Sequence, residues 1–422
     1  MSPYVFHSSG SEEAIFFFSW RNCRFLHNKT ITDFLYCKEK CLYKVKTHRL
    51  FIITKSRMGF FTSSKKQNQA KSANDENLIV VDNMPLASDS QSDELPKTYK
   101  ESLPELKRKY EENDSKLTES QNKMYKDVLD YVSDPEFKLP SELKSESWKK
   151  VLDKNYNIEG FTSLSSYEKF FLTRECLLRF LVGCKWNFKD TISKLVETLV
   201  WRREFGLTYD PTLKDTNVTC DLIEPENKTG KQVIMGYDKN GSVLLYLKDG
   251  LQNTEPSQRQ VQQMIFMIDQ CVMLNPKYVS KVTILVDFKH YPEVEGVVKK
   301  RKMTPLGIAK QCLHICQTYY PETLGYAVFI NIPWIGYALL KVMTPLIDPN
   351  TKQRLVFDEP FTNRIDSSNL DYHYGGDLKF DYNHESYWPD FKTKVEGRRA
   401  ENYERWVKLG GSIGLREVEF KP

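Results

Sequence analysis

The sequence of 422 residues lacks the cysteine and histidine patterns that identify metal sites and disulfide frameworks. Its nine cysteines are an odd number without a CxxC pair, which favours reduced thiols in the cytosol. Its seven histidines form neither an HExxH motif nor a ligand-spaced cluster, so we predict no metal. The 61 basic residues exceed the 56 acidic ones only slightly, which argues against a nucleic-acid-binding surface.

Long apolar runs are also scarce. The apolar burst at 14–20 is too short to span a membrane, and it lacks a clean signal-peptide cleavage site. A second run at 333–347 reads PWIGYALLKVMTPLI, but it has only 15 residues and Pro345 interrupts it. A transmembrane interpretation is therefore weak, and the sequence gives no indication of secretion.

Two short matches to catalytic or nucleotide-binding motifs fail on inspection. The segment Gly410–Gly414 matches the GxSxG nucleophile elbow, but the last histidine, His384, precedes the serine instead of following it. The segment Thr229–Lys231 resembles the end of a phosphate loop, yet Pro225 replaces the first glycine and Gln232 the final Ser or Thr. We therefore predict no catalytic residues and no cofactor.

The residues that are present indicate a folded core behind a long polar leader. Hydrophobic residues make up 40% of the chain and aromatic residues 13%, which is ample for a globular core. Residues 1–57 show no sustained periodicity and are predicted to be an unstructured extension. Residues 58–118 are rich in Lys, Ser, Asn, Asp and Gln, so we predict a disordered polar linker there.

The segment Met58–Ser63 within this leader allows two interpretations. If translation starts at Met58, its Met-Gly-x-x-x-Ser pattern matches a signal for myristoylation of Gly59. Such short motifs often match by chance, so an internal methionine in a flexible tail is the preferred interpretation.

Helical periodicity begins near residue 120. Residues 165–206 are typical of a helical hairpin: Ser165 and Glu168 form a capping box, a turn follows at 185–187, and Gly206 stands at the expected C-cap. We therefore predict an all-helical lobe over residues 119–215.

Beyond residue 220, short apolar runs of strand character alternate with longer helical stretches. This alternation predicts an α/β domain with a mainly parallel sheet over 216–384, followed by a C-terminal helix and tail over 385–422. A hairpin turn at Asp238–Gly241 joins the first two strands. The expected strands are 232–237, 243–247, 282–288, 327–332 and 354–357, and the expected crossover helices are 260–274 and 308–320.

The predicted helix at 333–347 is apolar all the way round, with Lys341 as its only charge. Such a helix needs apolar neighbours on every side. It is therefore either a buried core helix or a lid that meets protein on one face and lipid on the other. The lid residues that we expect to matter are Trp334, Tyr337, Leu340 and Met343.

Glu322 lies just before the first of the two expected strands that flank this helix, and Arg354 opens the second. In a β-α-β unit the two strands run parallel, so their starts lie at one sheet edge and the two side chains come close together. A guanidinium suits a phosphodiester and a carboxylate suits sugar hydroxyls. The alternative is a plain surface ion pair.

Several blocks taken together resemble the fungal phosphatidylinositol transfer proteins, in which a CRAL-TRIO lipid-binding domain follows a small helical lobe. The blocks are Thr173–Leu181, Trp201–Gly206, Gly230–Val233, Tyr319–Leu324, Asn331–Trp334 and Ile347–Thr351. The run Phe357–Phe361 and the Tyr387–Pro389 segment look like the yeast pleiotropic-drug-resistance subgroup.

The resemblance implies a CRAL-TRIO fold, with a sheet-floored apolar pocket under a lid helix, and a headgroup site. In that site Glu322 and Arg354 hold the inositol phosphate, and Thr351 and Arg179 assist. The chain departs from the family in two places. Arg354 stands where the subgroup usually has Lys, and Val182–Gly183 stand where the family commonly has a further Arg.

The implied function is to extract phosphatidylinositol from membranes and exchange it between them, in support of lipid homeostasis and drug tolerance. Two acyl chains contain about 30 methylenes at roughly 0.8 kcal/mol each, so such a pocket must be as apolar as the bilayer. Phosphatidylcholine or a sterol is a candidate second ligand. We expect a cytoplasmic monomer, peripheral to the endoplasmic reticulum, lipid droplets or microsomes. The alternative is a lipid- or sterol-sensing adaptor that presents lipid to a phosphoinositide kinase or another lipid-metabolising enzyme.

Overall fold

The computed structural model describes residues 79–80, 97–140, 160–213, 216–291, 294–298 and 304–422. These residues belong to the unit formed by residues 70–422. The predicted extension at 1–57 and the Met58–Ser63 motif lie outside the described residues.

A five-stranded sheet with the order β4-β5-β6-β7-β8 forms the centre of the fold. Its strands are β4 (Gln232–Tyr237), β5 (Val243–Gly250), β6 (Val282–His290), β7 (Leu324–Ile330) and β8 (Leu355–Phe357). Only β4 and β5 pair antiparallel, while β5 to β8 are parallel. The predicted mainly parallel sheet is confirmed.

The hairpin between β4 and β5 forms because one carboxylate satisfies the turn. The side chain of Asp238 accepts hydrogen bonds from the backbone N–H groups of Asn240 at 2.8 Å and Ser242 at 2.9 Å, and Gly241 takes a positive φ of 75° that a glycine adopts without strain.

Helices connect the parallel strands as the sequence predicts. Helix α8 (Gln258–Leu274) joins β5 to β6, and α9 (Leu306–Tyr319) joins β6 to β7. Between β7 and β8 lie α10 (Trp334–Met343), the 3₁₀ turn η7 (Thr344–Leu346) and α11 (Pro349–Lys352). Val261 and Ile265 of α8 are fully buried in the main core, together with side chains of β4 and β5 such as Ile234 and Leu245.

The helical lobe has a second core of its own. Its elements are α3 (Glu119–Ser133), α4 (Ser166–Phe171), α5 (Arg174–Gly183) and α6 (Phe188–Phe205), with a short antiparallel pair of β2 (Lys138–Pro140) and β3 (Phe161–Ser163). The Ser165 capping box and the left-handed C-cap at Gly206, with φ of 87°, are confirmed. The first arm of the predicted hairpin is two helices, because Thr173 caps a new helix at α5.

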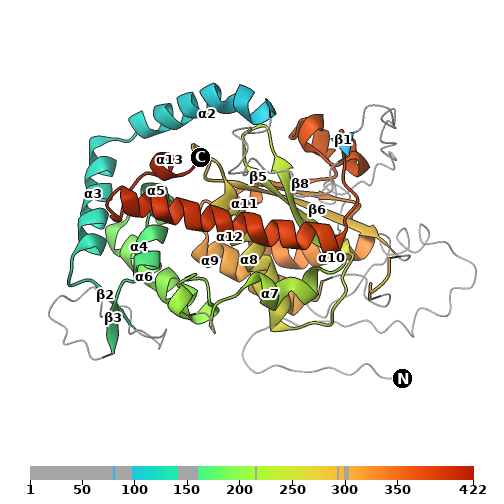
Figure 1. The fold of residues 1–422 in the computed structure, drawn as a ribbon, viewed down its shortest axis with the longest axis horizontal. Coiled ribbons are helices and arrows are strands. Elements are labelled where there is room, and N and C mark those ends of the chain that lie inside the picture. The colour runs from blue at the N-terminus through green and yellow to red at the C-terminus, as the bar shows by residue number, and fades with distance from the viewer. Residues whose placement is uncertain (1–78, 81–96, 141–159, 214–215, 292–293, 299–303) are drawn as a thin grey trace, which may run out of the picture. The chain divides into compact units, whose positions relative to one another are not determined.

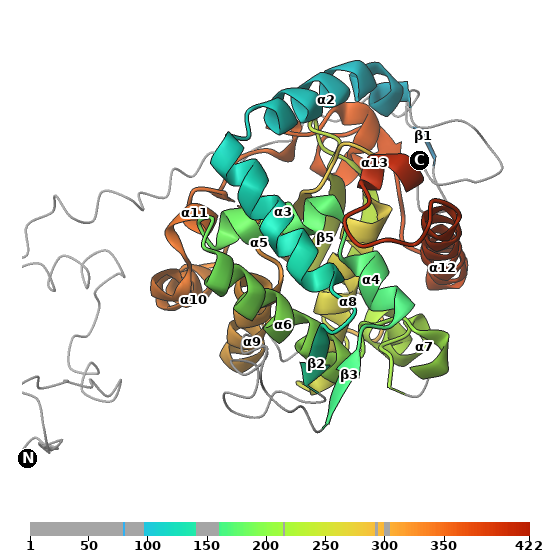
Figure 2. The ribbon, with the colours of Figure 1, turned by 90° about the vertical axis from the view of Figure 1, so that its left-hand side faces the viewer.

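Helix α2 (Lys97–Ser115) lies within the segment 58–118 that the sequence predicts as a linker. The linker prediction is wrong for these residues. Helix α2 has the polar composition of a solvated segment, and exposed ion pairs between its own residues stabilise it, such as Arg108 with Glu105 at 2.6 Å. Among the described residues, a small set of contacts attaches it to the rest of the fold. Figure 2 shows α2 along the top of the fold and α3 descending from it across the face of the helical lobe.

Those few contacts attach α2 to the lobe and to the segment before β6. Leu106 is buried beside Val279. The Tyr110 hydroxyl donates to Glu175 of α5 at 2.6 Å, and Asp114 pairs with Arg174 and Arg416.

The C-terminal region covers the main core. Helix α12 (His384–Lys408) packs on α8 and leads to α13 (Glu417–Phe420), as Figure 1 shows. Tyr387, Phe391 and Val395 of α12 are fully buried in the core.

The remaining elements are β1 (Ile79–Val80) paired with β9 (Leu378–Lys379), α7 (Cys220–Ile223) and the 3₁₀ turns η5 (Pro211–Leu213), η6 (Glu224–Asn227), η8 (Phe361–Asn363), η9 (Ser367–Asn369) and η10 (Tyr372–Tyr374).

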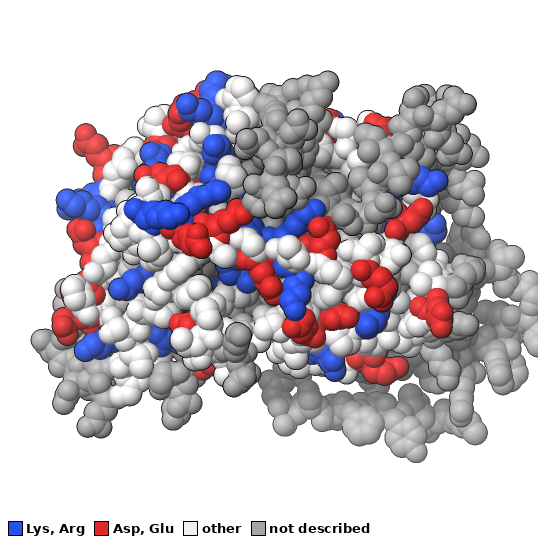
Figure 3. Space-filling model, viewed as in Figure 1, with Lys and Arg blue, Asp and Glu red and all other residues white. Residues whose placement is uncertain are grey.

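Charged residues of both signs intermingle over the face that carries α12, as Figure 3 shows. Within the described ranges, no helix is long and apolar enough to cross a membrane.

Candidate functional site

Glu322 and Arg354 lie together at the amino-terminal edge of the sheet. Arg354 directly precedes β8, and Glu322 lies in the turn before β7 with a φ of 55°. The Nη2 of Arg354 donates to Oε2 of Glu322 at 2.6 Å, and its Nη1 donates to the backbone carbonyl of Leu324. The pairing expected from the β-α-β connection is therefore present.

Lys281 is a third member of this cluster that sequence reasoning missed. It directly precedes β6, and its Nζ lies 3.2 Å from Oε2 of Glu322. The same Nζ donates to the backbone carbonyl of Glu322. A basic residue one position before a predicted parallel strand was the available signal, because the starts of β6, β7 and β8 meet at one edge.

The charges in this cluster shift one another's pKa values. Partial burial raises the pKa of Glu322, but the hydrogen bond from Arg354 and the charge of Lys281 outweigh burial and hold it below its usual range. Burial and the nearby charge of Arg354 lower the pKa of Lys281 to about 8. Glu322 is thus an anion between two cations, and one of these cations titrates near neutral pH.

A cavity of about 390 Å³ opens beside this cluster. Glu322, Lys281 and Arg179 line it, together with residues of α2 such as Lys109 and Asn113. Arg354 reaches this cavity only through its hydrogen bond with Glu322. The helix that was predicted as linker therefore forms one wall of the candidate site.

Arg179 projects from α5 and is nearly buried. Its Nη1 lies 3.8 Å from Oε1 of Glu417 in α13 and has no hydrogen-bond partner among the described residues. The structure thus brings Arg179 to the cavity that Glu322 lines, but pairs it loosely with the C-terminal segment.

Thr351 lies apart from the cavity-lining residues. It sits in α11, where its backbone N–H donates to Asp348 at 2.9 Å and its carbonyl accepts from the N–H of Arg354 at 2.9 Å. Thr351 therefore fixes the backbone that presents Arg354.

The segment Val182–Gly183, where the family commonly carries a further Arg, has a clear place in the structure. Val182 is exposed and lines the cavity. A Cβ atom on Gly183 would lie 2.8 Å from Cβ of Pro321, so glycine permits α5 to approach the turn that holds Glu322.

Helix α10 is largely exposed, so the buried-core interpretation is wrong. Only Gly336 and Met343 are buried, while Trp334 is 80% and Val342 51% exposed. The helix contacts protein along a narrow stripe and leaves the rest of its apolar surface uncovered. Of the predicted lid residues, Met343 is in the stripe, Tyr337 and Leu340 are half-buried, and Trp334 points to solvent.

A second apolar surface runs across the neighbouring strands. Phe288 of β6, Phe329 of β7 and Phe357 of β8 stack in a row, with ring centroids 6.4 and 5.2 Å apart. Phe357, on the edge strand, is 40% exposed. These rings form an apolar floor at the end of the sheet from which α10 starts.

One hydrogen bond ties α10 to this part of the sheet. The hydroxyl of Tyr337 donates to Oδ2 of Asp358, the residue directly after β8. Burial and the Asp358 carboxylate raise the pKa of Tyr337 to about 12, so the hydroxyl remains a donor at neutral pH.

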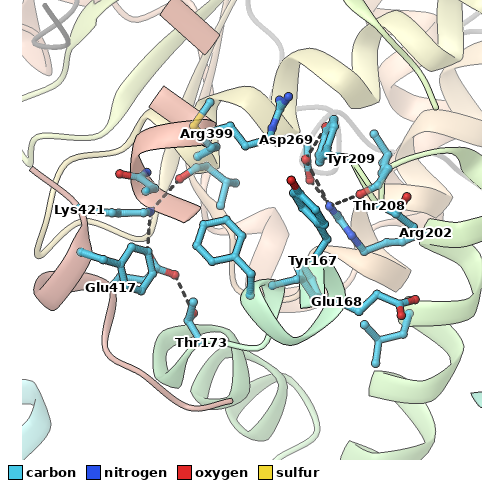
Figure 4. A pocket seen from close by; sticks show the side chains of 18 of the residues that line it. Tyr167, Glu168, Thr173, Arg202, Thr208, Tyr209, Asp269, Arg399, Glu417 and Lys421 are labelled. Carbon is cyan, nitrogen blue, oxygen red and sulfur yellow. Dashed lines mark hydrogen bonds and ion pairs between the residues drawn. The ribbon is translucent and has the colours of Figure 1, made fainter. Parts of the chain in front are cut away.

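A smaller cavity of about 110 Å³ lies between the helical lobe and helices α8 and α12 (Figure 4). Several of its polar groups are engaged with one another: Arg202 donates to Asp269 at 2.8 Å, Tyr209 donates to Asp269 at 2.7 Å, and Lys421 pairs with Glu417 at 2.6 Å. This network attaches the lobe to the sheet domain.

The chain belongs to the CRAL-TRIO family. The CRAL/TRIO domain matches residues 227–376, and the CRAL/TRIO N-terminal domain matches residues 124–197. The fold class and the family that the sequence blocks indicate are thereby confirmed.

Its relatives include a protein that is named as a phosphatidylinositol transfer protein. The phosphatidylinositol transfer protein PDR17 of Saccharomyces cerevisiae is 45% identical over 305 residues, which cover 72% of this chain and 84% of that protein. A CRAL-TRIO domain-containing protein of Schizosaccharomyces pombe is 37% identical over 72% of this chain and 27% of its own length. The crystal structure of Sfh5 matches 64% of this chain and 91% of its own, with a TM-score of 0.41 and 17% identity.

Proposed function

We propose that this protein extracts phosphatidylinositol from membranes and transfers it between them. The observation that carries the proposal is the cluster of Glu322, Arg354 and Lys281 beside a cavity of about 390 Å³. The cations suit the phosphodiester, and the carboxylate accepts hydrogen bonds from inositol hydroxyls. The relative PDR17 is named as a phosphatidylinositol transfer protein, which supports the same ligand.

The apolar surfaces supply the other half of the ligand's requirements. The acyl chains lie against the Phe288, Phe329 and Phe357 row, and α10 covers them as a lid. At the membrane, Trp334 and the other exposed residues of α10 enter the interface while the lid swings outward. This movement exposes the floor to lipid without exposing it to water.

The protein acts by binding and release, without catalysis, and it associates only peripherally with membranes of the endoplasmic reticulum or lipid droplets. The helical lobe over 119–215 and the domain over 216–384 together enclose the ligand. We extend the proposal to a role in lipid homeostasis and drug tolerance. In this proposal the protein acts as a monomer, and phosphatidylcholine or a sterol is its second ligand.

The decisive experiment has two parts. Lipid that copurifies with the full-length protein is extracted and identified by mass spectrometry, and transfer of labelled phosphatidylinositol between vesicles is then measured. We expect bound phosphatidylinositol and transfer well above the rate without protein. Bound phosphatidylinositol without transfer would instead support an adaptor that presents lipid to a kinase. The absence of both bound phosphatidylinositol and transfer would refute the proposal.

A further inference from the structure

The charges around Glu322 do not balance. Lys281 and Arg354 both contact the same oxygen, Oε2 of Glu322, at 3.2 and 2.6 Å. Two cations therefore share one carboxylate, and one positive charge is left over. If Arg354 were the only partner, the pair would be neutral and would attract a phosphodiester weakly.

Glu322 keeps one oxygen for a ligand. Among the described residues, no hydrogen bond reaches its Oε1, because both cations use Oε2. The two charged donors fix the carboxylate through Oε2, so Oε1 is held in position to accept a hydrogen bond from a hydroxyl.

The carboxylates that α2 and α5 present to the cavity are already engaged elsewhere. From α2, Asp114 pairs with Arg174 and Arg416. From α5, Glu175 accepts from Tyr110 at 2.6 Å and from the backbone of Glu417 at 2.8 Å. The titratable and charged residues that face Lys281 across this cavity are Lys109, Tyr110, Asp114, Glu175, Arg179, Tyr278 and Glu322. Of the carboxylates in that set, Glu322 is the one in contact with Lys281.

We propose that Lys281 is a specificity-determining residue of the headgroup site, where its ammonium binds a phosphate oxygen together with Arg354 while Glu322 accepts from the inositol hydroxyls. This inference rests on the proposed function and adds a residue to it. Lys281 lines the cavity and is partly exposed, so its ammonium can turn from the Glu322 carbonyl to a ligand without leaving Oε2.

The proposal predicts an unusual pH dependence. Burial lowers the pKa of Lys281 to about 8 in the ligand-free protein, whereas phosphate favours the charged form. Above pH 8, binding must therefore take up a proton, and affinity should fall by up to about tenfold for each pH unit. Below about pH 7.5 Lys281 is already charged, and affinity should not change through this group.

The test measures how labelled phosphatidylinositol partitions between vesicles and the full-length protein from pH 7 to 9.5. Lys281→Met should lower partition about tenfold or more at pH 7 and remove the fall above pH 8. Lys281→Arg keeps its charge throughout, so it should bind at pH 7 and also lack the fall. Lys289→Met, at the exposed opposite end of β6, should behave like the wild type.

Circular dichroism melting of each variant separates recognition from a merely structural role. The proposal is overturned if Lys281→Met partitions like the wild type, if wild-type partition does not change above pH 8, or if Lys281→Arg fails to restore binding. Wild-type protein that takes up no phosphatidylinositol at any pH would refute the proposed function itself, and this inference with it.

Discussion

Arg202 and Asp269 form a buried ion pair that connects the helical lobe to helix α8. Arg202 also donates to the carbonyl of Leu207 at 2.8 Å, and Asp269 accepts from the hydroxyls of Tyr209 and Tyr320. Burial raises the pKa of Asp269, but the charge of Arg202 and these hydrogen bonds outweigh burial and hold it below its usual range. The side chains of Arg202 and Asp269 therefore join the helical lobe to α8, and single substitutions can test their contribution to stability.

Replacing Arg202 with Met should destabilise the protein by about 3–5 kcal/mol, because Asp269 would be left as an unpaired buried charge. The surface variant Lys107→Ala should cost less than about 0.5 kcal/mol, since its pair with Glu111 is exposed. Urea unfolding followed by circular dichroism gives both values. Equal stabilities of the two variants would contradict the role assigned to the pair.

The same pair determines how stability depends on acid. A depressed pKa in the folded state means that Asp269 contributes stability above the carboxyl's ordinary pKa near 4, and that this contribution is lost as pH falls through the lower folded value. We therefore expect unfolding free energy to decline below about pH 4 in the wild type, and the Arg202→Met variant should lose less over that range. Parallel pH curves for the two proteins would speak against this.

Glu322→Ala combined with Arg354→Ala should abolish phosphatidylinositol transfer while the fold survives. Each charge-assisted hydrogen bond is worth about 1.5–3 kcal/mol, so losing two weakens binding roughly a hundredfold or more. The matched control is Lys352→Ala, on the exposed helix just before Arg354, which should transfer normally. A folded double variant that transfers phosphatidylinositol at the parental rate would disprove the headgroup assignment.

Asp substitutions along α10 should separate packing from membrane contact. Leu340→Asp and Met343→Asp place a carboxylate at half-buried and buried positions, which costs up to several kcal/mol, so we expect slower transfer, with a lower melting temperature for Met343→Asp. Val342→Asp lies at an exposed position and should slow transfer between vesicles without changing the melting temperature. Unchanged transfer in all three folded variants would show that α10 is not a lid.

Tyr337→Phe removes the hydrogen bond that ties α10 to Asp358. Such a bond at an exposed site is worth about 1 kcal/mol, so the lid should open roughly fivefold more often and release labelled lipid to vesicles faster. Asp358→Asn, which keeps an acceptor in place, should have a smaller effect. Slower release from Tyr337→Phe would indicate that the hydroxyl contributes to membrane contact instead.

Deletion of residues 1–57 should leave melting temperature and lipid binding unchanged, because the sequence shows no structural element there. Deletion through residue 117 should lower both, since it removes α2 with its contacts to Glu175, Arg174 and Arg416. If the deletion of 1–57 lowered the melting temperature by several degrees, or the longer deletion did not lower it, the assignment of a structural role to α2 but not to residues 1–57 would be wrong.

Much of the fold could be predicted from sequence because local signals and tertiary structure agree. The Ser165 capping box, Gly206 and the Asp238 turn each satisfy backbone hydrogen-bonding groups locally, so the sequence at these positions predicts where helices and strands begin or end. Strand β7 begins at Leu324, three residues before the predicted start, because its pairing with Val282 of β6 extends it.

The failures occurred where contacts between distant segments decide the outcome. Helix α2 is polar, and its attachment through Leu106 and Tyr110 depends on residues far along the chain. Helix α10 has the apolar composition of a core helix, but its exposure depends on how much of the neighbouring protein packs against it, which its own sequence does not determine. The Glu322 and Arg354 pair was predictable from topology, whereas the contact of Arg179 with Glu417 depends on where the last six residues fold back.

The cluster of Glu322, Arg354 and Lys281, which we propose as the headgroup site, lies at the amino-terminal edge of the parallel strands, where crossover helices end. Helix α9 ends at Tyr319, three residues before Glu322, and α11 ends at Lys352, two residues before Arg354. Helix carboxyl ends carry partial negative charge, so this edge stabilises cationic side chains and repels a bare phosphate. Phosphate binding in the proposed site must therefore come from the side chains of Lys281 and Arg354 and not from helix ends. Ionic strength at the membrane surface should set how readily the protein loads and unloads.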